Sequence, residues 1–142
     1  RPYVQPDGTI RPDWELRTLD TCTLPAPLSL SWDPETVVGR IRCHGQLVPA
    51  FSDVFRAVFD AGLWSELREF GGCYAWRPQR GGTKLSLHCW GAAIDLNPST
   101  NQLGEMGDMP ASIIQIFEAH GFHWGGRFAR PDAMHFQYAT GY

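Results

Sequence analysis

The sequence predicts an α+β domain in which two helices pack against a small antiparallel sheet. Two segments with helical spacing of apolar residues, 47–61 and 110–120, alternate with short apolar runs that are typical of strands. The chain has 142 residues, of which 43% are hydrophobic and 19% are charged, as in ordinary folded proteins. This length predicts one domain with a core of its own.

The N-terminal part of the chain shows no periodic pattern of apolar residues over its first 46 positions. Prolines interrupt regular secondary structure, and six of them occur here: Pro2, Pro6, Pro12, Pro25, Pro27 and Pro34. Turns and short strands laid over a core fit this composition, and so does an ordered arm. We therefore expect residues 1–40 to form an irregular N-terminal arm that packs on the core or extends from it.

Two helices are expected in the rest of the chain. The apolar residues of 47–61 form one stripe at helical spacing: Val48, Phe51, Val54, Phe55, Val58 and Phe59. The second helix covers 110–120, because Pro110 is a start signal and Gly121 is a stop signal. His120 falls in its last turn, where a side-chain donor can meet free carbonyl groups.

Short strands are expected between and after the helices. Aromatic residues that follow a glycine turn predict a strand within 69–77, and the apolar run 91–96 predicts a buried strand. Two further short strands are expected near 122–125 and 134–138. Short antiparallel strands interleaved with helices in this order indicate the α+β class.

Charge and hydropathy disfavour two classes of function. The net charge is −3 and no cluster of Lys and Arg is visible, which disfavours nucleic-acid binding. No run of 18 apolar residues is present, so we expect no membrane span, and no native targeting segment is visible in this chain. The oligomeric state is open, and a monomer is the starting assumption. The disulfide state of the four cysteines is also open, and none of them forms a C-x-x-C zinc motif: Cys22, Cys43, Cys73 and Cys89.

Two histidines and an aspartate are the clearest candidates for a chemical site. His88, Asp95 and His135 are ligand types that suit zinc, and three protein ligands leave a fourth position for water. His88 and Asp95 are seven positions apart, which corresponds to about 10.5 Å along a helix and more than about 20 Å along a strand. They can share a metal only if the chain turns between them, and Gly91 is the natural place for that turn.

Asp132 lies three positions before His135 in a D-x-x-H segment. A turn just before a strand can place this carboxylate beside a water on the metal, which is where a general base belongs. The sequence therefore predicts a catalytic site in addition to a metal site.

Three segments together carry a resemblance to a known family. They are Ser86-Leu87-His88-Cys89-Trp90-Gly91-Ala92-Ala93-Ile94-Asp95, Trp124-Gly125-Gly126 and Asp132-Ala133-Met134-His135-Phe136. Their order and spacing resemble the zinc peptidases of peptidoglycan peptides. That group includes D-Ala-D-Ala carboxypeptidases and dipeptidases, and the L-alanyl-D-glutamate endopeptidases of phage endolysins. The resemblance covers roughly residues 41–138 and implies the fold shared with the amino-terminal domain of hedgehog proteins. It makes residues 41–142 the expected zinc peptidase domain.

The resemblance implies a role for each matching residue. The two histidines and Asp95 would hold one Zn²⁺ per chain, and Asp132 would be the catalytic base and then the acid. Arg77 matches an arginine that polarises the scissile carbonyl, a role for which Arg80 is the competing candidate.

Three further residues are candidates for substrate binding. Ser86 matches a serine that contacts substrate in some members of the family, although it could instead cap a turn. Trp124 belongs to the second motif, and packing is the alternative role for its ring. His123 is next to it and could line the cleft.

The resemblance implies a zinc metallopeptidase that hydrolyses a peptide bond in peptidoglycan stem peptides. Asp132 as the base and Phe136-Gln137 after the last ligand favour an L-alanyl-D-glutamate endopeptidase, and a D-alanyl-D-alanine carboxypeptidase is the alternative. A zinc-containing module that binds the cell wall or a partner without catalysis is the alternative of another class. We expect a location that faces the cell wall: periplasmic, secreted or phage-delivered.

Overall fold

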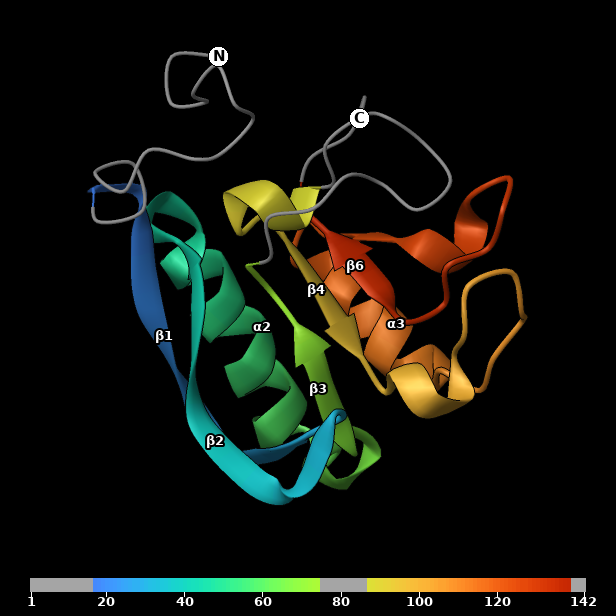
Figure 1. Cartoon of the computed structure of the whole chain (residues 1–142), viewed down its shortest axis with the longest axis horizontal. Helices are drawn as coiled ribbons and strands as arrows, with labels where there is room; N and C mark the ends of the chain where they lie inside the picture. Colours follow the sequence, from blue (N-terminus) through green and yellow to red (C-terminus); the bar gives the residue numbers. More distant parts are fainter. Residues whose placement is uncertain (1–16, 75–86, 139–142) are drawn as a thin grey trace.

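The structure is a computed structural model that describes residues 17–74 and 87–138. Its centre is a six-stranded sheet with the strand order β2-β1-β3-β4-β6-β5 (Figure 1). The strands are β1 (Leu19–Leu30), β2 (Asp33–His44), β3 (Glu69–Gly72), β4 (Ala93–Leu96), β5 (His123–Trp124) and β6 (His135–Gln137). The α+β class is confirmed, and the sheet is larger than expected. One pair, β1 with β3, is parallel, because the chain leaves β2, passes through a helix and returns beside β1 in the same direction as β1.

The N-terminal hairpin corrects the expectation of an irregular arm. The stretch 19–40 consists of β1, a two-residue turn and most of β2, and the two strands of 12 residues each are paired, so that expectation is wrong for this stretch. Residues 1–16 of the expected arm lie outside the described residues. Pro25 and Pro27 fall at a break in the register between Thr23 and Leu28, where a residue without an N–H costs no ladder hydrogen bond. The hairpin also contributes buried residues to the core, namely Cys22, Leu24, Leu28, Ile41 and Cys43.

The two expected helices are present. They are α2 (Val48–Asp60), which has a proline in its first turn, and α3 (Ala111–Ala119). His120 caps α3: its Nδ1–H donates to the carbonyl of Ile116 at 2.8 Å, as expected for its place in the last turn. Gly121 follows with φ +89°, a conformation that ends helices and that side chains other than glycine rarely adopt.

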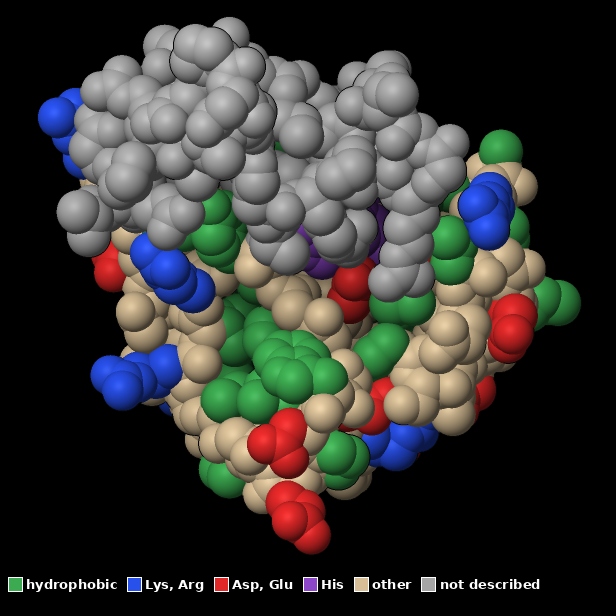
Figure 2. All heavy atoms as spheres, viewed as in Figure 1, with side chains coloured by type: hydrophobic (Ala, Val, Ile, Leu, Met, Phe, Trp, Pro, Cys, Tyr) green, Lys and Arg blue, Asp and Glu red, His purple; other side chains and the backbone are tan. Residues whose placement is uncertain are grey.

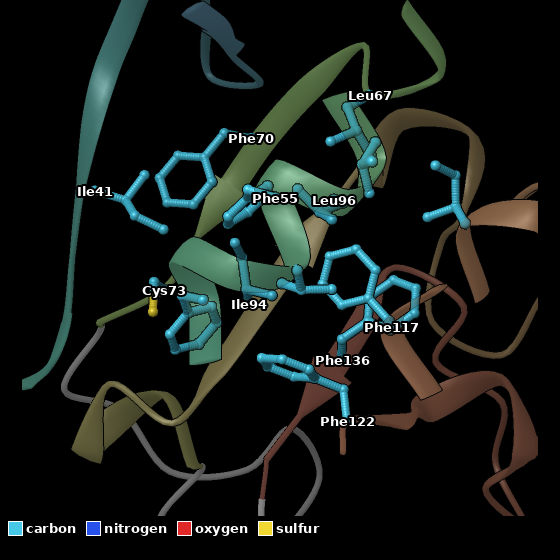
Figure 3. Packing of buried hydrophobic residues seen from close by; sticks show 14 of the residues in the cluster. Ile41, Phe55, Leu67, Phe70, Cys73, Ile94, Leu96, Phe117, Phe122 and Phe136 are labelled. Atoms are coloured by element: carbon cyan, nitrogen blue, oxygen red, sulfur yellow. The ribbon is translucent and has the colours of Figure 1, made fainter. Parts of the chain in front are cut away.

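Both helices pack on one face of the sheet and form the core with it (Figure 3). Phe55 of α2 and Phe117 of α3 meet edge to face with ring centroids 6.0 Å apart. Phe117 in turn lies 4.4 Å from the ring of Phe136 on β6. Because side chains alternate along a strand, the residues between these core positions face the other side of the sheet. No helix in the described part of the chain is long and apolar enough to cross a membrane.

Candidate metal centre

Two of the predicted ligands lie opposite each other on neighbouring strands. Asp95 of β4 pairs with His135 of β6, so both side chains leave the same face of the sheet. This is the face opposite the core, since the flanking pair of Ile94 and Phe136 is fully buried under the helices. The Oδ1 atom of Asp95 is 3.3 Å from Nδ1 of His135. In Figure 2, histidine side chains and an acidic side chain lie next to each other on the face of the molecule on which Figure 1 shows β4 and β6.

The third ligand comes from a short 3-10 helix, η3 (Leu87–Trp90), and reaches the strands through a turn at Gly91. Gly91 has φ +65°, and a Cβ atom there would lie 2.5 Å from the backbone N of His44. Its carbonyl accepts a hydrogen bond from that same N–H at 3.0 Å, which ties the turn to the end of β2. The turn places Nε2 of His88 3.2 Å from Oδ1 of Asp95, as the spacing predicted.

Each imidazole makes a second hydrogen bond on the side away from Asp95. Nδ1 of His88 donates to the carbonyl of Cys73 at 2.8 Å, which leaves Nε2 directed at the aspartate. Nε2 of His135 is 2.8 Å from Oε1 of Gln137, which leaves Nδ1 directed at the aspartate. A metal-binding histidine holds its other ring N–H in the same way.

These atoms fit the dimensions of a zinc site. The three ligand atoms all lie within 4.8 Å of one another, and all three residues are buried. Two ligands of a tetrahedral zinc ion, each about 2.0–2.1 Å from it, lie about 3.3 Å apart. The separations of 3.2 and 3.3 Å from Asp95 to the two imidazoles match this value. Nitrogen and carboxylate donors in this ratio suit zinc.

The electrostatics of the site also favour a cation. Burial opposes the charged form of Asp95, but the neighbouring His88 and His135 outweigh it, so the pKa of this carboxyl group is lowered. Burial opposes the charge of His135 as well, yet its contacts with Asp95 raise the pKa of the imidazole above its usual value. A carboxylate that stays ionised in a buried pocket with two imidazoles is arranged for a positive partner.

Asp132 lies at the rim of this group. Its Oδ2 atom is 3.9 Å from Nδ1 of His135, and its side chain is 24% exposed, whereas the ligands are buried. The N–H of His135 donates to the Asp132 carbonyl at 3.0 Å, so the turn that the D-x-x-H spacing predicted is present. The carboxylate is therefore beside the ligand atoms and open to solvent, as a general base requires.

A comparison with protein families found one similarity, in the C-terminal part of the chain. Residues 80–138 match the family model described as D-alanyl-D-alanine carboxypeptidase, a family of zinc peptidases. Over this segment the chain is similar to that peptidase family. It contains His88, Asp95 and His135 together with Asp132, whereas the N-terminal hairpin and α2 lie outside the matched residues. Comparisons with curated proteins and with solved structures gave no match.

The W-G-G motif positions the turn that carries Asp132. Trp124 donates its indole N–H to the carbonyl of Ala133 at 2.8 Å, inside the turn that carries Asp132. A Cβ atom on Gly125 would lie 2.5 Å from the Asp132 carbonyl oxygen, and one on Gly126 would overlap the Trp124 ring. The carbonyl of Gly125 accepts the N–H of Asp132 at 2.9 Å. Gly125 is therefore required for the backbone to approach this turn, and Gly126 leaves room for the Trp124 ring.

The structure describes the positions of two of the remaining predicted site residues, His123 and Trp124. His123 pairs with Gln137, so it lies on the same face of the sheet as the ligands, and it is exposed. Trp124 pairs with Phe136 and packs against the core, with its indole N–H bonded to the backbone. Contact of either with substrate stays a prediction. Arg77, its competitor Arg80, and Ser86 lie outside the described residues, so their roles stay predictions too.

Two groups that hold the ligands were not predicted from the sequence. The carbonyl of Cys73 gives no signal in a sequence, because every residue has one. Gln137 does give a signal, because its place two residues after His135 on a strand puts both side chains on one face. Three of the cysteines, Cys22, Cys43 and Cys73, are buried free thiols.

Proposed function

We propose that this protein is a zinc-dependent hydrolase of a peptide bond in peptidoglycan stem peptides. The observation that carries the proposal is the position of Asp132 beside the buried group of His88, Asp95 and His135. The match of this segment to D-alanyl-D-alanine carboxypeptidases supports the substrate class. A location that faces the cell wall, whether periplasmic, secreted or phage-delivered, is part of the same proposal.

The chain's own residues account for the proton transfers of such a reaction. His88, Asp95 and His135 would hold a zinc ion, which would supply a lowered pKa for a water molecule and polarisation of the scissile carbonyl. Asp132 removes a proton from the water as its oxygen attacks the carbonyl carbon. The same carboxyl group then returns this proton to the leaving amine, so that the C–N bond breaks and no net proton is consumed. Its exposure of 24% leaves room for the substrate to approach from solvent.

Two bonds of the stem peptide are candidates. The description of the matched family favours removal of a terminal D-alanine from D-Ala-D-Ala. The segment Asp132 to Gln137, with an aspartate as the base and Phe136-Gln137 after the ligand, favours an endopeptidase that cuts between L-Ala and D-Glu. We place the carboxypeptidase first, because the matched family is described by that activity.

The test is mass spectrometry of defined muropeptides after incubation with the zinc-loaded protein. Loss of one terminal D-alanine identifies a carboxypeptidase, and release between L-Ala and D-Glu identifies an endopeptidase. The matched control is Asp132→Asn, which preserves the shape of the side chain. It should retain zinc and lose at least about 100-fold in rate. Intact muropeptides with zinc bound would overturn the proposal and favour a binding module that does not catalyse.

A further inference from the structure

Gln137 is a buried polar side chain next to the metal ligands that has no part in the proposed proton transfers. It lies two residues after His135 on β6, on the same face of the sheet, and it is 7% exposed. Its Oε1 atom is 2.8 Å from Nε2 of His135. Burial of an amide is costly unless it is hydrogen-bonded, so this contact is a specific feature of the site.

The sheet determines where the amide of Gln137 can lie. Its backbone pairs with Ala93 of β4 on one side and with His123 of β5 on the other. A residue held by ladders on both edges has little freedom to move its Cα atom. The side chain therefore reaches the imidazole from a position that the strands set, as second-shell partners of good metal sites do.

The need for this contact follows from the chemistry of a neutral imidazole. The ring carries one N–H, either on Nδ1 or on Nε2. Asp95 lies 3.3 Å from Nδ1 of His135 and, as a carboxylate, attracts the proton to that nitrogen. A proton on Nδ1 blocks this nitrogen as a ligand. An acceptor at Nε2 is required to draw the proton to the other side of the ring.

We propose that Gln137 is a positioning residue that holds His135 in its Nε2–H tautomer and so presents Nδ1 to the metal. Its Oε1 atom accepts the Nε2–H, and the amide cannot take up the proton itself. His88 needs no such side chain, because the backbone carbonyl of Cys73 accepts its Nδ1–H at 2.8 Å. The effect on zinc affinity rests on the proposed zinc site, whereas the effect on the tautomer does not depend on metal.

The decisive experiment combines two measurements on Gln137→Met, a side chain of similar size that lacks the amide. Long-range proton–nitrogen NMR spectra of protein with labelled histidines, recorded at alkaline pH without metal, show which ring nitrogen of His135 carries the proton. We expect Nε2–H in the wild type and a shift toward Nδ1–H in the variant. Competition with a chelator should show zinc affinity at least about 10-fold weaker in the variant.

Two further variants separate positioning from packing. Gln137→Glu retains an acceptor at the same place and should restore the Nε2–H tautomer and zinc affinity to near the wild-type values. Gln115→Met makes the same substitution on the exposed side of α3 and should change neither measurement. Zinc affinity in Gln137→Met within twofold of the wild type, or an unchanged tautomer, would overturn the proposal.

The wild-type spectrum keeps the test decisive if Gln137→Met does not fold. An Nδ1–H tautomer of His135 in the metal-free wild type would by itself refute the role of Gln137. Failure of the proposed function would give a different set of results. In that case the wild type binds zinc and shows Nε2–H on His135, but leaves muropeptides intact.

Discussion

The ligands on strands and the ligand on the turn are held by different means. Asp95 and His135 face each other across the β4–β6 ladder, so backbone hydrogen bonds set their separation. His88 lies in η3, and its position depends on one glycine turn docked against the end of β2. The candidate metal centre therefore depends on the N-terminal hairpin, although that hairpin lies outside the segment that matches the peptidase family.

Removal of the ligand on the turn should have the largest effect. His88→Ala should retain the β4–β6 ladder and lose zinc affinity by more than about 100-fold. Even mutation of a residue that only hydrogen-bonds a metal ligand lowers metal affinity by about 10–100-fold. Chelator competition measures the affinity, and circular dichroism checks that the fold is retained. Stoichiometric zinc at wild-type affinity in this variant would remove His88 from the ligand set.

The turn itself can be broken without touching a ligand. In Gly91→Ala, the new Cβ atom meets the backbone of Cys43 and His44, and φ +65° is unfavourable for alanine. We expect a loss of about 2–4 kcal/mol in unfolding free energy and about 10–100-fold weaker zinc binding. Gly62→Ala is the matched control, because Gly62 has φ +75° with nothing within 4 Å. It should lose about 1 kcal/mol and bind zinc normally.

The strand side of the site can be perturbed through the turn that carries Asp132, the proposed base. Gly125→Ala would push against the Asp132 carbonyl and the Cβ atom of His135, and so displace the turn that carries the base. We expect kcat/KM on stem peptides to fall about 10-fold, with a smaller change in zinc affinity. Gly39→Ala, where a Cβ atom meets nothing within 4 Å, should leave both values unchanged. An equal loss in the two variants would contradict the role assigned to Gly125.

The smallest expected effect is the pH dependence of the strand pair without metal. The raised pKa of His135 contributes stability that is full below its usual value of 6.5 and is lost as pH rises through the raised value. The lowered pKa of Asp95 contributes stability above 3.8 that is lost as pH falls below it. Unfolding free energy should therefore be highest between these limits and decline by the order of 1 kcal/mol on each side.

Two further measurements test this pH dependence, one on a variant without the Asp95 charge and one with zinc added. Asp95→Asn should flatten both slopes in urea unfolding curves, because it removes the charge that shifts each pKa. Zinc should reverse the upper slope, since metal binding releases protons and strengthens as pH rises. A metal-free wild type whose stability rises steadily from pH 5 to 9 would contradict the proposed pairing.

Several parts of the fold were predictable because they depend on local patterns. The apolar stripe of 47–61 predicted α2, and the signals around 110–121 predicted α3 and the capping role of His120. The hairpin was not predictable in this way. Its prolines argued against strands, and only the break in register between Thr23 and Leu28, which depends on the partner strand, accommodates Pro25 and Pro27.

The amino-acid sequence by itself determined which residues could form a metal centre. Histidine and aspartate are the groups that bind zinc, the spacing of His88 and Asp95 required a turn, and only glycine adopts that turn easily at Gly91. Tertiary structure alone decided which ring nitrogen of each histidine faces the aspartate. That choice depends on acceptors from other segments, the carbonyl of Cys73 and the amide of Gln137, whose distances the folded sheet sets.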